Sequence, residues 1–594
     1  MVDRYTKLRW RRRFKRSQRQ VENFSIQAEQ GVDKYFFGRL PRLSNVRRFV
    51  TGWVLLIFLL GVGLVFQVRA LSPYYQTVQS AEGGIFTEGI VGHFTTANPL
   101  YATSSVDSSV SRLIFSGLMQ YNGHDQLIGD LASEVTSDER ATVFTAKLKD
   151  NIYWHDGKPV TADDVVFTYQ LIQNPDAKSP LQSNWKSVKI EKVDDRTVRF
   201  TLPHALASFK NLLTNGIIPK HKLEKVHPSQ LRTDAFNVTS PIGSGPFKWD
   251  SIQISGQTPE EREEQIGLSA NLEYYGGEPD LDKFIVKAVN NKDLLVKRFN
   301  DQQVDAMVGI DKMPDNIDKD AVVKENSIPL DAQVMVFFKS SNDVLGDKAV
   351  RQALTKATNR AEILNGLGYP VKPSEGPLLH SHLGFAKDVT QFGYNLEEAN
   401  AILDQNGWVK NQEGVREKSG KKLSFSLSSQ NNSEYAYTSQ ILQRQWREVG
   451  ADVKVDLESD TDLQSTIASH NYDSLLYGIS VGNDPDVYAY WHSSQADVRS
   501  SSRLNFSEFK SALADSALDA GRTRTDPNLR AVKYRSFLTA WRDEAPAIAL
   551  YQPRFLYISR GVVYGFDNKV LNTAVDRFWN VQNWRVRTEK VTIQ

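Results

Sequence analysis

The chain has 594 residues, of which 40% are hydrophobic and 24% charged, with a formal net charge of +2. This length is too great for one small core, and the composition is that of a globular protein of two or three lobes rather than a disordered or low-complexity chain. The sequence contains no cysteine, which excludes disulfide bonds and attachment through a lipid on an N-terminal cysteine.

The net charge averages two unlike parts. Residues 1–48 carry fourteen Lys and Arg against four acidic residues, about +10, which leaves about −8 on the rest. Residues 49–68 follow with no charge, and twenty helical residues span roughly 30 Å, the thickness of a bilayer's hydrocarbon core. Because the basic residues precede this segment, we expect a transmembrane helix with a cytoplasmic N-terminus and a large extracytoplasmic part.

Two alternatives concern this N-terminal region. Val68-Arg69-Ala70 weakly resembles a signal-peptidase site, but both the apolar run and the basic leader are longer than those of a usual signal peptide. The basic tail has the charge of a nucleic-acid-binding segment, yet basic clusters beside a span more often set topology and contact anionic lipid. We therefore expect a membrane anchor, no nucleic-acid partner, and a short polar tether over residues 69–83.

The globular part is expected to begin with a strand at 85–92. Further on, residues 152–175 predict a strand, a turn at Asp156-Gly157 and a helix. Thr161 and Asp164 have the spacing of a capping box. Val165, Tyr169 and Ile172 repeat at helical spacing, and the helix must end before Pro175.

Residues 154–167 resemble the W-x-D-G-x-P-x-T-A-x-D-V-x-F signature of the extracytoplasmic solute-binding proteins of peptide and nickel ABC transporters, solute-binding protein family 5. Other segments resemble the same family in the same order: the Asn98-Pro99-Leu100 turn, the turn at 243–247, the helix at 347–364, the Asn-capped helix at 395–407, a helix followed by a strand at 438–457, and the closing helix, Pro and strand at 537–558. The resemblance covers about residues 85–590.

The resemblance implies an α/β, two-lobed periplasmic-binding-protein-like fold, type II, of the three-subdomain peptide-binding variety, preceded by one N-terminal transmembrane helix. Lobe I is expected at 84–328 plus 546–594, with an inserted subdomain at about 104–239. Lobe II is expected at 329–545. Residues 258–264, rich in Glu, suggest an exposed hairpin tip between two strands.

Three motifs invite a catalytic or metal interpretation. His155 and Asp156 are neighbours on an extended segment and point to opposite faces, which disfavours a dyad. Ser244 lacks the Gly two residues before it that a nucleophile elbow requires. His380-Ser381-His382 places two imidazoles in a loop, a weak metal signal that we interpret as a polar loop. We expect no enzyme, no catalytic residue, no metal and no cofactor.

Residues 472–493 are the expected ligand-binding segment. Leu475, Tyr477, Ile479 and Val481 alternate as in a strand that leads to a turn at 483–485. The resemblance implies that this strand lines the cleft and pairs with an extended peptide, whereas a strand without ligand contact is the alternative. The candidate ligand-binding residues are Ser104, Ser105, Val106, Asp107, Tyr477, Ile479, Val481, Gly482, Asn483, Asp484 and Trp491.

The chain departs from the family's peptide-binding pattern at Val481. Peptide binders of the family typically carry an Asp at this position, four residues before the Pro of the turn, and its carboxylate pairs with the ligand's α-ammonium. A buried ammonium without a counter-charge is strongly disfavoured, which puts recognition of a free peptide N-terminus in doubt. Asp484 or Asp486 would substitute only if the loop were shifted.

These observations favour a membrane-anchored, extracellular or periplasmic solute-binding protein. It is expected to capture a peptide or similar polar organic solute between two lobes, as a monomer, and to deliver it to ABC transporter permease subunits. The alternative is a surface sensor or scaffold of the same fold that binds a protein partner.

Overall fold

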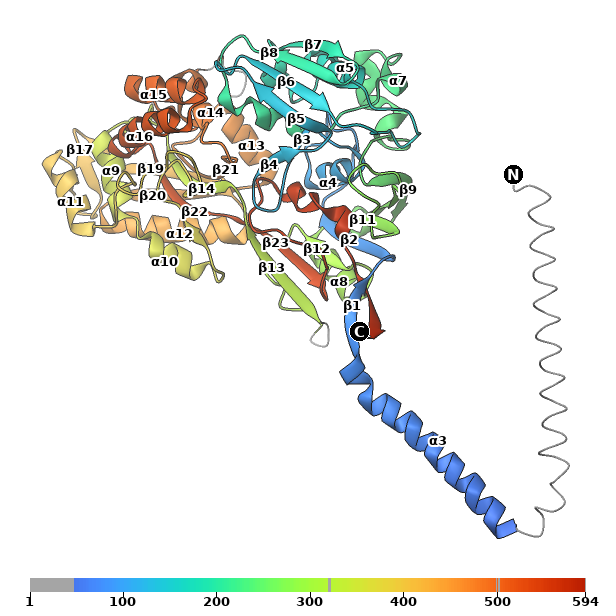
Figure 1. Ribbon diagram of the computed structural model, residues 1–594. Coiled ribbons are helices and arrows are strands. Elements are labelled where there is room, and N and C mark those ends of the chain that lie inside the picture. The colour runs from blue at the N-terminus through green and yellow to red at the C-terminus, as the bar shows by residue number, and fades with distance from the viewer. Residues whose placement is uncertain (1–46, 319–321, 498, 500–502, 593–594) are drawn as a thin grey trace. The chain divides into compact units, whose positions relative to one another are not determined.

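A computed structural model describes residues 47–318, 322–497, 499 and 503–592 of the chain (Figure 1). The chain forms two compact units, residues 1–79 with 588–594, and residues 80–587. The predicted basic tail at 1–48 lies outside the described residues except for its last two.

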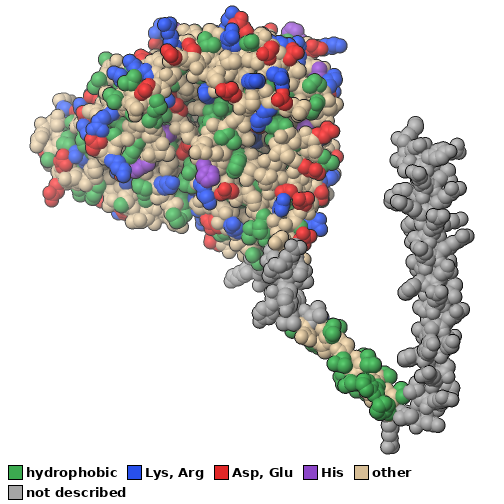
Figure 2. Space-filling view, viewed as in Figure 1, with side chains coloured by type: hydrophobic (Ala, Val, Ile, Leu, Met, Phe, Trp, Pro, Cys, Tyr) green, Lys and Arg blue, Asp and Glu red, His purple; other side chains and the backbone are tan. Residues whose placement is uncertain are grey.

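In the first unit, helix α3 (Arg47–Tyr75) contains the predicted span. Over the described ranges, one helix is long and apolar enough to cross a membrane, at Phe49–Gln67, and none of this stretch is buried. Figure 2 shows hydrophobic side chains along it. The predicted polar tether is different in the structure: α3 continues to Tyr75, and β1 (Gln76–Ala81) pairs with β24 (Arg587–Thr592). Local composition could not reveal this pairing because the partner strand lies some 500 residues away.

The second unit has two lobes, and the sheet of lobe I has seven strands. Its order is β13 (Val323–Pro329), β23 (Arg554–Arg560), β12 (Ala306–Val308), β2 (Ile85–Val91), β11 (Lys283–Val289), β10 (Glu263–Ala270) and β9 (Phe247–Ser255). β2 is parallel to both of its neighbours, while the other pairs are antiparallel. Helices α4 (Ser105–Ile114) and α8 (Lys292–Asn300) pack against this sheet. The strand expected at 85–92 is confirmed.

A smaller layer lies between β2 and β9 in the chain (Figure 1). It contains the hairpin β3 (Met119–Tyr121) and β4 (Leu127–Gly129), and a sheet of β5 (Ala132–Ser137), β6 (Val143–Leu148), β8 (Thr197–Thr201) and β7 (Lys189–Asp194). Its helices are α5 (Ala162–Gln173), α6 (Gln182–Trp185) and α7 (Lys220–Leu223). The predicted capping box of α5 is confirmed, since the Thr161 amide donates to the Asp164 carboxylate at 2.9 Å. The predicted inner face is also buried, and Tyr169 stacks on Trp185 with 4.0 Å between ring centroids.

The hairpin expected around 258–264 is present, but its second half is not exposed. Glu263 and Glu264 belong to β10 and are buried. Glu264 accepts from the Phe94 amide at 2.5 Å, and Arg298 pairs with Glu263. Glu264 also pairs with Arg262 at 2.7 Å, so one buried charge is compensated by a neighbour in the hairpin and the other by Arg298 of α8.

Lobe II is built on a six-stranded sheet. Its order is β15 (Lys372–Pro373), β22 (Ala547–Gln552), β14 (Ala332–Phe338), β21 (Ser474–Ser480), β19 (Ser424–Gln430) and β20 (Asp452–Glu458). Its helices are α9 (Lys348–Ala357), α10 (Arg360–Gly366), α11 (Leu396–Gln405), α12 (Ser433–Glu448), α13 (Asp460–Ser469), α14 (Tyr488–Trp491), α15 (Ala512–Arg522) and α16 (Pro527–Glu544). Three short strands, β16 (Val409–Lys410), β17 (Arg416–Lys418) and β18 (Lys421–Lys422), form a separate sheet.

Two details of this lobe differ from the sequence-based expectation. The helix expected at 347–364 is divided into α9 and α10, because Asn359 leaves the helical path and its side chain caps α10. The chain was expected to return to lobe I at residue 546, yet β22 still pairs with β14 in the lobe II sheet. The strand after Pro553, β23, is the one that joins lobe I.

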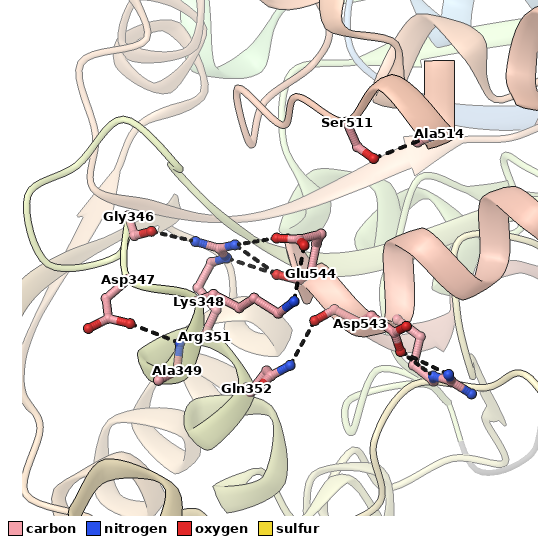
Figure 3. A network of polar contacts seen from close by, with 11 residues as sticks. Gly346, Asp347, Lys348, Ala349, Arg351, Gln352, Ser511, Ala514, Asp543 and Glu544 are labelled. Carbon is pink, nitrogen blue, oxygen red and sulfur yellow. Dashed lines mark hydrogen bonds and ion pairs between the residues drawn. The ribbon is translucent and has the colours of Figure 1, made fainter. Parts of the chain in front are cut away.

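The end of α16 is fixed to α9 by a buried arginine (Figure 3). Arg351 donates to the backbone oxygens of Leu345, Gly346 and Glu544 at 2.8 to 3.1 Å. Lys348, on the surface, pairs with the Glu544 carboxylate at 3.1 Å. This network therefore holds the C-terminal end of α16 against α9, just before the chain enters β22.

Two short crossings connect the lobes. β13 passes to β14 through Leu330 and Asp331, and β22 passes to β23 through Pro553. The crossings lie side by side, since the Leu330 amide donates to the Pro553 oxygen at 3.0 Å. This pair of crossings has the geometry of a hinge.

Candidate ligand-binding cleft

The two lobes meet through a few polar contacts. The Asn483 side-chain amide, from lobe II, donates to the backbone oxygen and the carboxylate of Asp125 at 2.5 and 2.6 Å. Asp125 lies at the tip of the β3–β4 hairpin. Ser208 donates to Asp486 at 2.8 Å. Because these contacts join side chains from opposite sides of the cleft, they hold the two lobes together.

One cavity lies at this junction and another lies in lobe I. One of about 900 Å³ lies between the smaller layer, including His204 and Phe209, and lobe II, including Tyr488, Asp519 and Arg522. The other, of about 570 Å³, lies in lobe I at the start of α4. Its lining residues include Ser104, Ser105, Asp311, Arg554 and Arg577.

The predicted residues of α4 divide into two groups. Ser104 and Ser105 line the smaller cavity, and the Ser104 hydroxyl also caps the helix by accepting from the Asp107 amide at 3.0 Å. Val106 is buried in the lobe I core. Asp107 is buried as well, and its carboxylate accepts from the Thr95 amide at 2.7 Å and the Thr96 amide at 3.1 Å. Both residues were expected at the cleft. Instead, Val106 packs in the core and Asp107 holds the loop at Thr95 and Thr96 against the start of α4.

The strand expected from the alternation of Leu475, Tyr477, Ile479 and Val481 is confirmed as β21, which ends at Ser480, one residue before Val481. Its ladder with β14 runs from Ser474 to Ser480, but its ladder with β19 ends at Leu476. Among the described residues, 477–480 therefore pair with β14 on one edge, and no sheet ladder continues along their other edge. The Tyr490 hydroxyl donates to the Ser480 oxygen at 2.7 Å.

Trp491 is not on a cleft wall, contrary to expectation. It is fully buried, with its ring stacked on Phe337 at 5.7 Å and edge-to-face with Trp541 at 5.6 Å. Ile479 is buried in the same core, and Tyr477 packs against it half-buried. The apolar alternation predicted the strand. It did not indicate that α14 and α16 would cover one face of that strand and bury Trp491.

The loop after β21 has its charges balanced internally. Asp484 receives two hydrogen bonds from Arg530, at 2.7 and 3.0 Å, and this carboxylate holds the pKa of Arg530 above its ordinary value. Asp486 pairs with Arg522 at 3.2 Å. Since both carboxylates are compensated, neither is free to supply the counter-charge that Val481 lacks.

Sequence reasoning missed three buried polar groups beside Val481. Asp331 is 1% exposed and Gln333 is fully buried, and neither side chain has a hydrogen-bond partner among the described residues. The same holds for one carboxylate oxygen of Asp125, which is 6% exposed. The available signal was the pattern of β14: Asp331 and Gln333 occupy every second position, in register with Met335 and Phe337 of an apolar strand face.

Asp331 lies opposite Val481. The Val481 and Gly482 amides both donate to the Asp331 backbone oxygen, at 3.0 and 3.1 Å. Burial, together with the nearby Asp125 carboxyl group, raises the pKa of Asp331 to about 9, while Lys372 acts in the opposite direction. Asp125 lies near Asp331, because it accepts from Asn483, the residue after Gly482.

The histidines of the catalytic and metal motifs have structural partners. The His155 ring contacts the Gly245 oxygen at 3.0 Å and accepts from the Gly243 amide at 3.2 Å, and burial lowers its pKa to about 4. His380 contacts Glu375 at 3.2 Å, whereas His382 contacts the Gly482 oxygen at 2.6 Å. These two imidazoles thus bind different partners, and no group of three metal-ligating side chains occurs among the described residues.

The sequence profile of the bacterial extracellular solute-binding proteins, family 5 Middle, matches residues 126–500. This match extends over more than half of the chain. The chain belongs to family 5 of the bacterial extracellular solute-binding proteins. The family consists of solute-binding proteins rather than enzymes, and the two-lobed fold described above agrees with this membership.

Two relatives align with most of this chain and with most of their own length. The oligopeptide-binding protein AppA of Bacillus subtilis is 29% identical over 491 residues, 80% of this chain and 87% of AppA. The structure of AppA with a nonapeptide has a TM-score of 0.69 at 26% identity, covering 86% of this chain and 100% of that one. NikZ of Campylobacter jejuni, solved with Ni(L-His), has a TM-score of 0.71 at 25% identity, covering 84% and 99%.

Proposed function

We propose that this family 5 protein is a membrane-anchored substrate-binding component of an ABC transporter that captures a peptide or similar polar organic solute and is not an enzyme. The relatives AppA, solved with a nonapeptide, and NikZ, solved with Ni(L-His), support a polar ligand held between the lobes. The protein works by closure of the lobes about the paired crossings and presents the closed form to permease subunits.

The observation that carries this proposal is the set of contacts between the lobes. Asn483 contacts Asp125 and Asp486 contacts Ser208 on the opposite side of the cleft. These contacts lie beside the expected ligand strand and form when the lobes are closed. In addition, residues 477–480 have one edge outside the sheet ladders. An extended peptide would add to that edge by backbone hydrogen bonds.

The proposed organisation keeps lobe I at 84–328 with the C-terminal segment, the inserted subdomain at about 104–239, and lobe II from 329 onward. The sheet pairing of β22 favours placing the return to lobe I at Pro553 rather than at 546. Of the candidate residues, Ser104, Ser105, Tyr477, Gly482 and Asn483 remain at or beside the cavities and the cleft strand.

The proposed anchor is α3, with the N-terminus in the cytoplasm, the large unit outside, and the protein a monomer. A tag placed before residue 47 should survive protease added to intact spheroplasts, whereas residues 80–587 should be digested. Digestion of the tag together with the large unit would contradict this topology.

Solute capture is tested on the full chain purified in detergent. We expect mass spectrometry of heat-released material to find a polar organic solute, and a peptide library to contain members that raise the melting temperature. A protein that releases no solute, and that no peptide stabilises, would contradict the proposed function and favour the sensor or scaffold alternative.

A further inference from the structure

The lobe junction contains buried acceptor groups that lack a counter-charge. Asp331 immediately precedes β14 and Gln333 is its second residue, so the two positions lie about 7 Å apart along the chain. Asp125 approaches from the hairpin tip of the opposite lobe, where it accepts from Asn483, the residue after Gly482. Buried carboxylates without a cation or donor are costly, so this arrangement demands a partner.

The charged neighbours do not supply that partner. Arg530 is bound to Asp484 and Arg522 to Asp486. Lys372 acts on Asp331 from a distance, is exposed, and forms no ion pair with it among the described residues. His382 also lies near Asp125, but its ring contacts the Gly482 oxygen, and burial lowers its pKa. Among the described residues, Asp331 and Asp125 therefore have no ion-paired cation.

We propose that Asp331 and Asp125, with the side-chain amide of Gln333, form the subsite that binds a protonated amine of the captured solute. The assignment rests on the proposed function, since the ligand must enter between the lobes. An ammonium group has three donors, and the unpartnered acceptors here are the two carboxylate oxygens of Asp331, one of Asp125 and the Gln333 oxygen. The Gln333 amide nitrogen remains to donate to a ligand oxygen beside the amine.

The location explains how the chain recognises an amine with Val481 on its cleft strand. Asp331 is the cross-strand neighbour of Val481, so its carboxylate lies on the strand next to it, at the crossing between the lobes. Asp125 and Asp331 come from opposite sides of the junction. An amine bound between them would therefore also favour the closed form, because opening would separate its two carboxylates.

The test uses the full chain in detergent, immobilised and offered a tryptic digest of casein in two forms. In one form the amines are free, and in the other they are blocked by propionylation. We expect the wild-type protein to retain free-amine peptides at least about tenfold better than blocked ones. Asp331→Asn and Asp125→Asn should reduce this preference to within about twofold. Asp343→Asn, which removes an exposed partner of Lys421, is the matched control and should keep it.

A second measurement needs no peptide. Ethylammonium chloride at about 50 mM should raise the wild-type melting temperature relative to sodium chloride of equal ionic strength, and should not do so for Asp331→Asn. Because the Asp331 side chain has no hydrogen-bond partner among the described residues, the Asn variant should fold, which circular dichroism checks.

The outcomes separate the two proposals. Retention of free and blocked peptides alike, unchanged by Asp331→Asn, would overturn the amine subsite and leave solute capture standing. Retention of neither digest would contradict peptide capture, and the ethylammonium shift would then decide the subsite alone. Stabilisation by manganese ion but not by ethylammonium would overturn the amine assignment in favour of a metal.

Discussion

The Asn483 side chain donates two hydrogen bonds to Asp125, one to its backbone oxygen and one to its carboxylate. The two residues lie 358 positions apart and on opposite sides of the cleft. Asn483 follows Gly482, whose amide donates to the Asp331 backbone oxygen, so the same loop contacts both acidic residues.

Asn483→Ala should weaken solute binding by roughly three- to tenfold, because closure loses a pair of hydrogen bonds of which at least one involves a charged group. The melting temperature of the ligand-free protein should change little. Peptide retention on the immobilised full chain gives the affinity, with Asn431→Ala, an exposed position of lobe II, as the control. Equal affinity in both variants would show that this contact does not contribute to the bound state.

The stability of the ligand-free protein should fall as pH rises from about 5 to 9. The pKa of Asp331 is raised from 3.8 to about 9 in the folded protein, so between these values the folded state holds a proton that the unfolded state has lost. The loss is on the order of 1 kcal/mol of unfolding free energy per pH unit. Melting curves across this range should show a smaller decline for Asp331→Asn, and identical pH profiles would contradict a protonated Asp331.

The Arg577–Glu88 pair in lobe I should be sensitive to removal of either charge. The guanidinium and carboxylate are 2.5 Å apart, and both side chains are almost completely buried. Arg577→Met should lower the free energy of unfolding by about 3–5 kcal/mol, because Glu88 is left charged in the core. Denaturant unfolding of the full chain measures this. The double variant Glu88→Gln/Arg577→Met should recover part of the loss, and a double variant less stable than Arg577→Met would contradict the explanation.

Two cations on α9 that contact Glu544 should differ in their contribution (Figure 3). Arg351→Ala leaves the oxygens of Leu345, Gly346 and Glu544 without a buried donor, at a cost of about 3 kcal/mol. Lys348→Ala removes an exposed ion pair with the same carboxylate and should cost less than about 1 kcal/mol. Denaturant midpoints compare the variants, and similar midpoints would indicate that the buried bonds add nothing beyond the surface pair.

Local signals predicted the elements well where their stabilising contacts are local. The capping box of α5, the Asn cap of α11 and the alternation of β21 depend on residues a few positions apart, and all three are present. Trp491 was misplaced because an aromatic residue beside the expected cleft strand suits a binding wall and a core equally well. Its burial depends on Phe337 and Trp541, which come from other elements.

The sequence by itself determined the family, the strand-turn-helix signature and the apolar span, because each is written in contiguous residues with fixed spacing or composition. Only the tertiary structure decided which acidic residues lack a counter-charge. Asp484 and Asp486 are neutralised by arginines of α15 and α16, while Asp331 and Asp125 meet across the lobe junction without one. Charge compensation is a property of distances in space, so no local pattern could separate these four carboxylates.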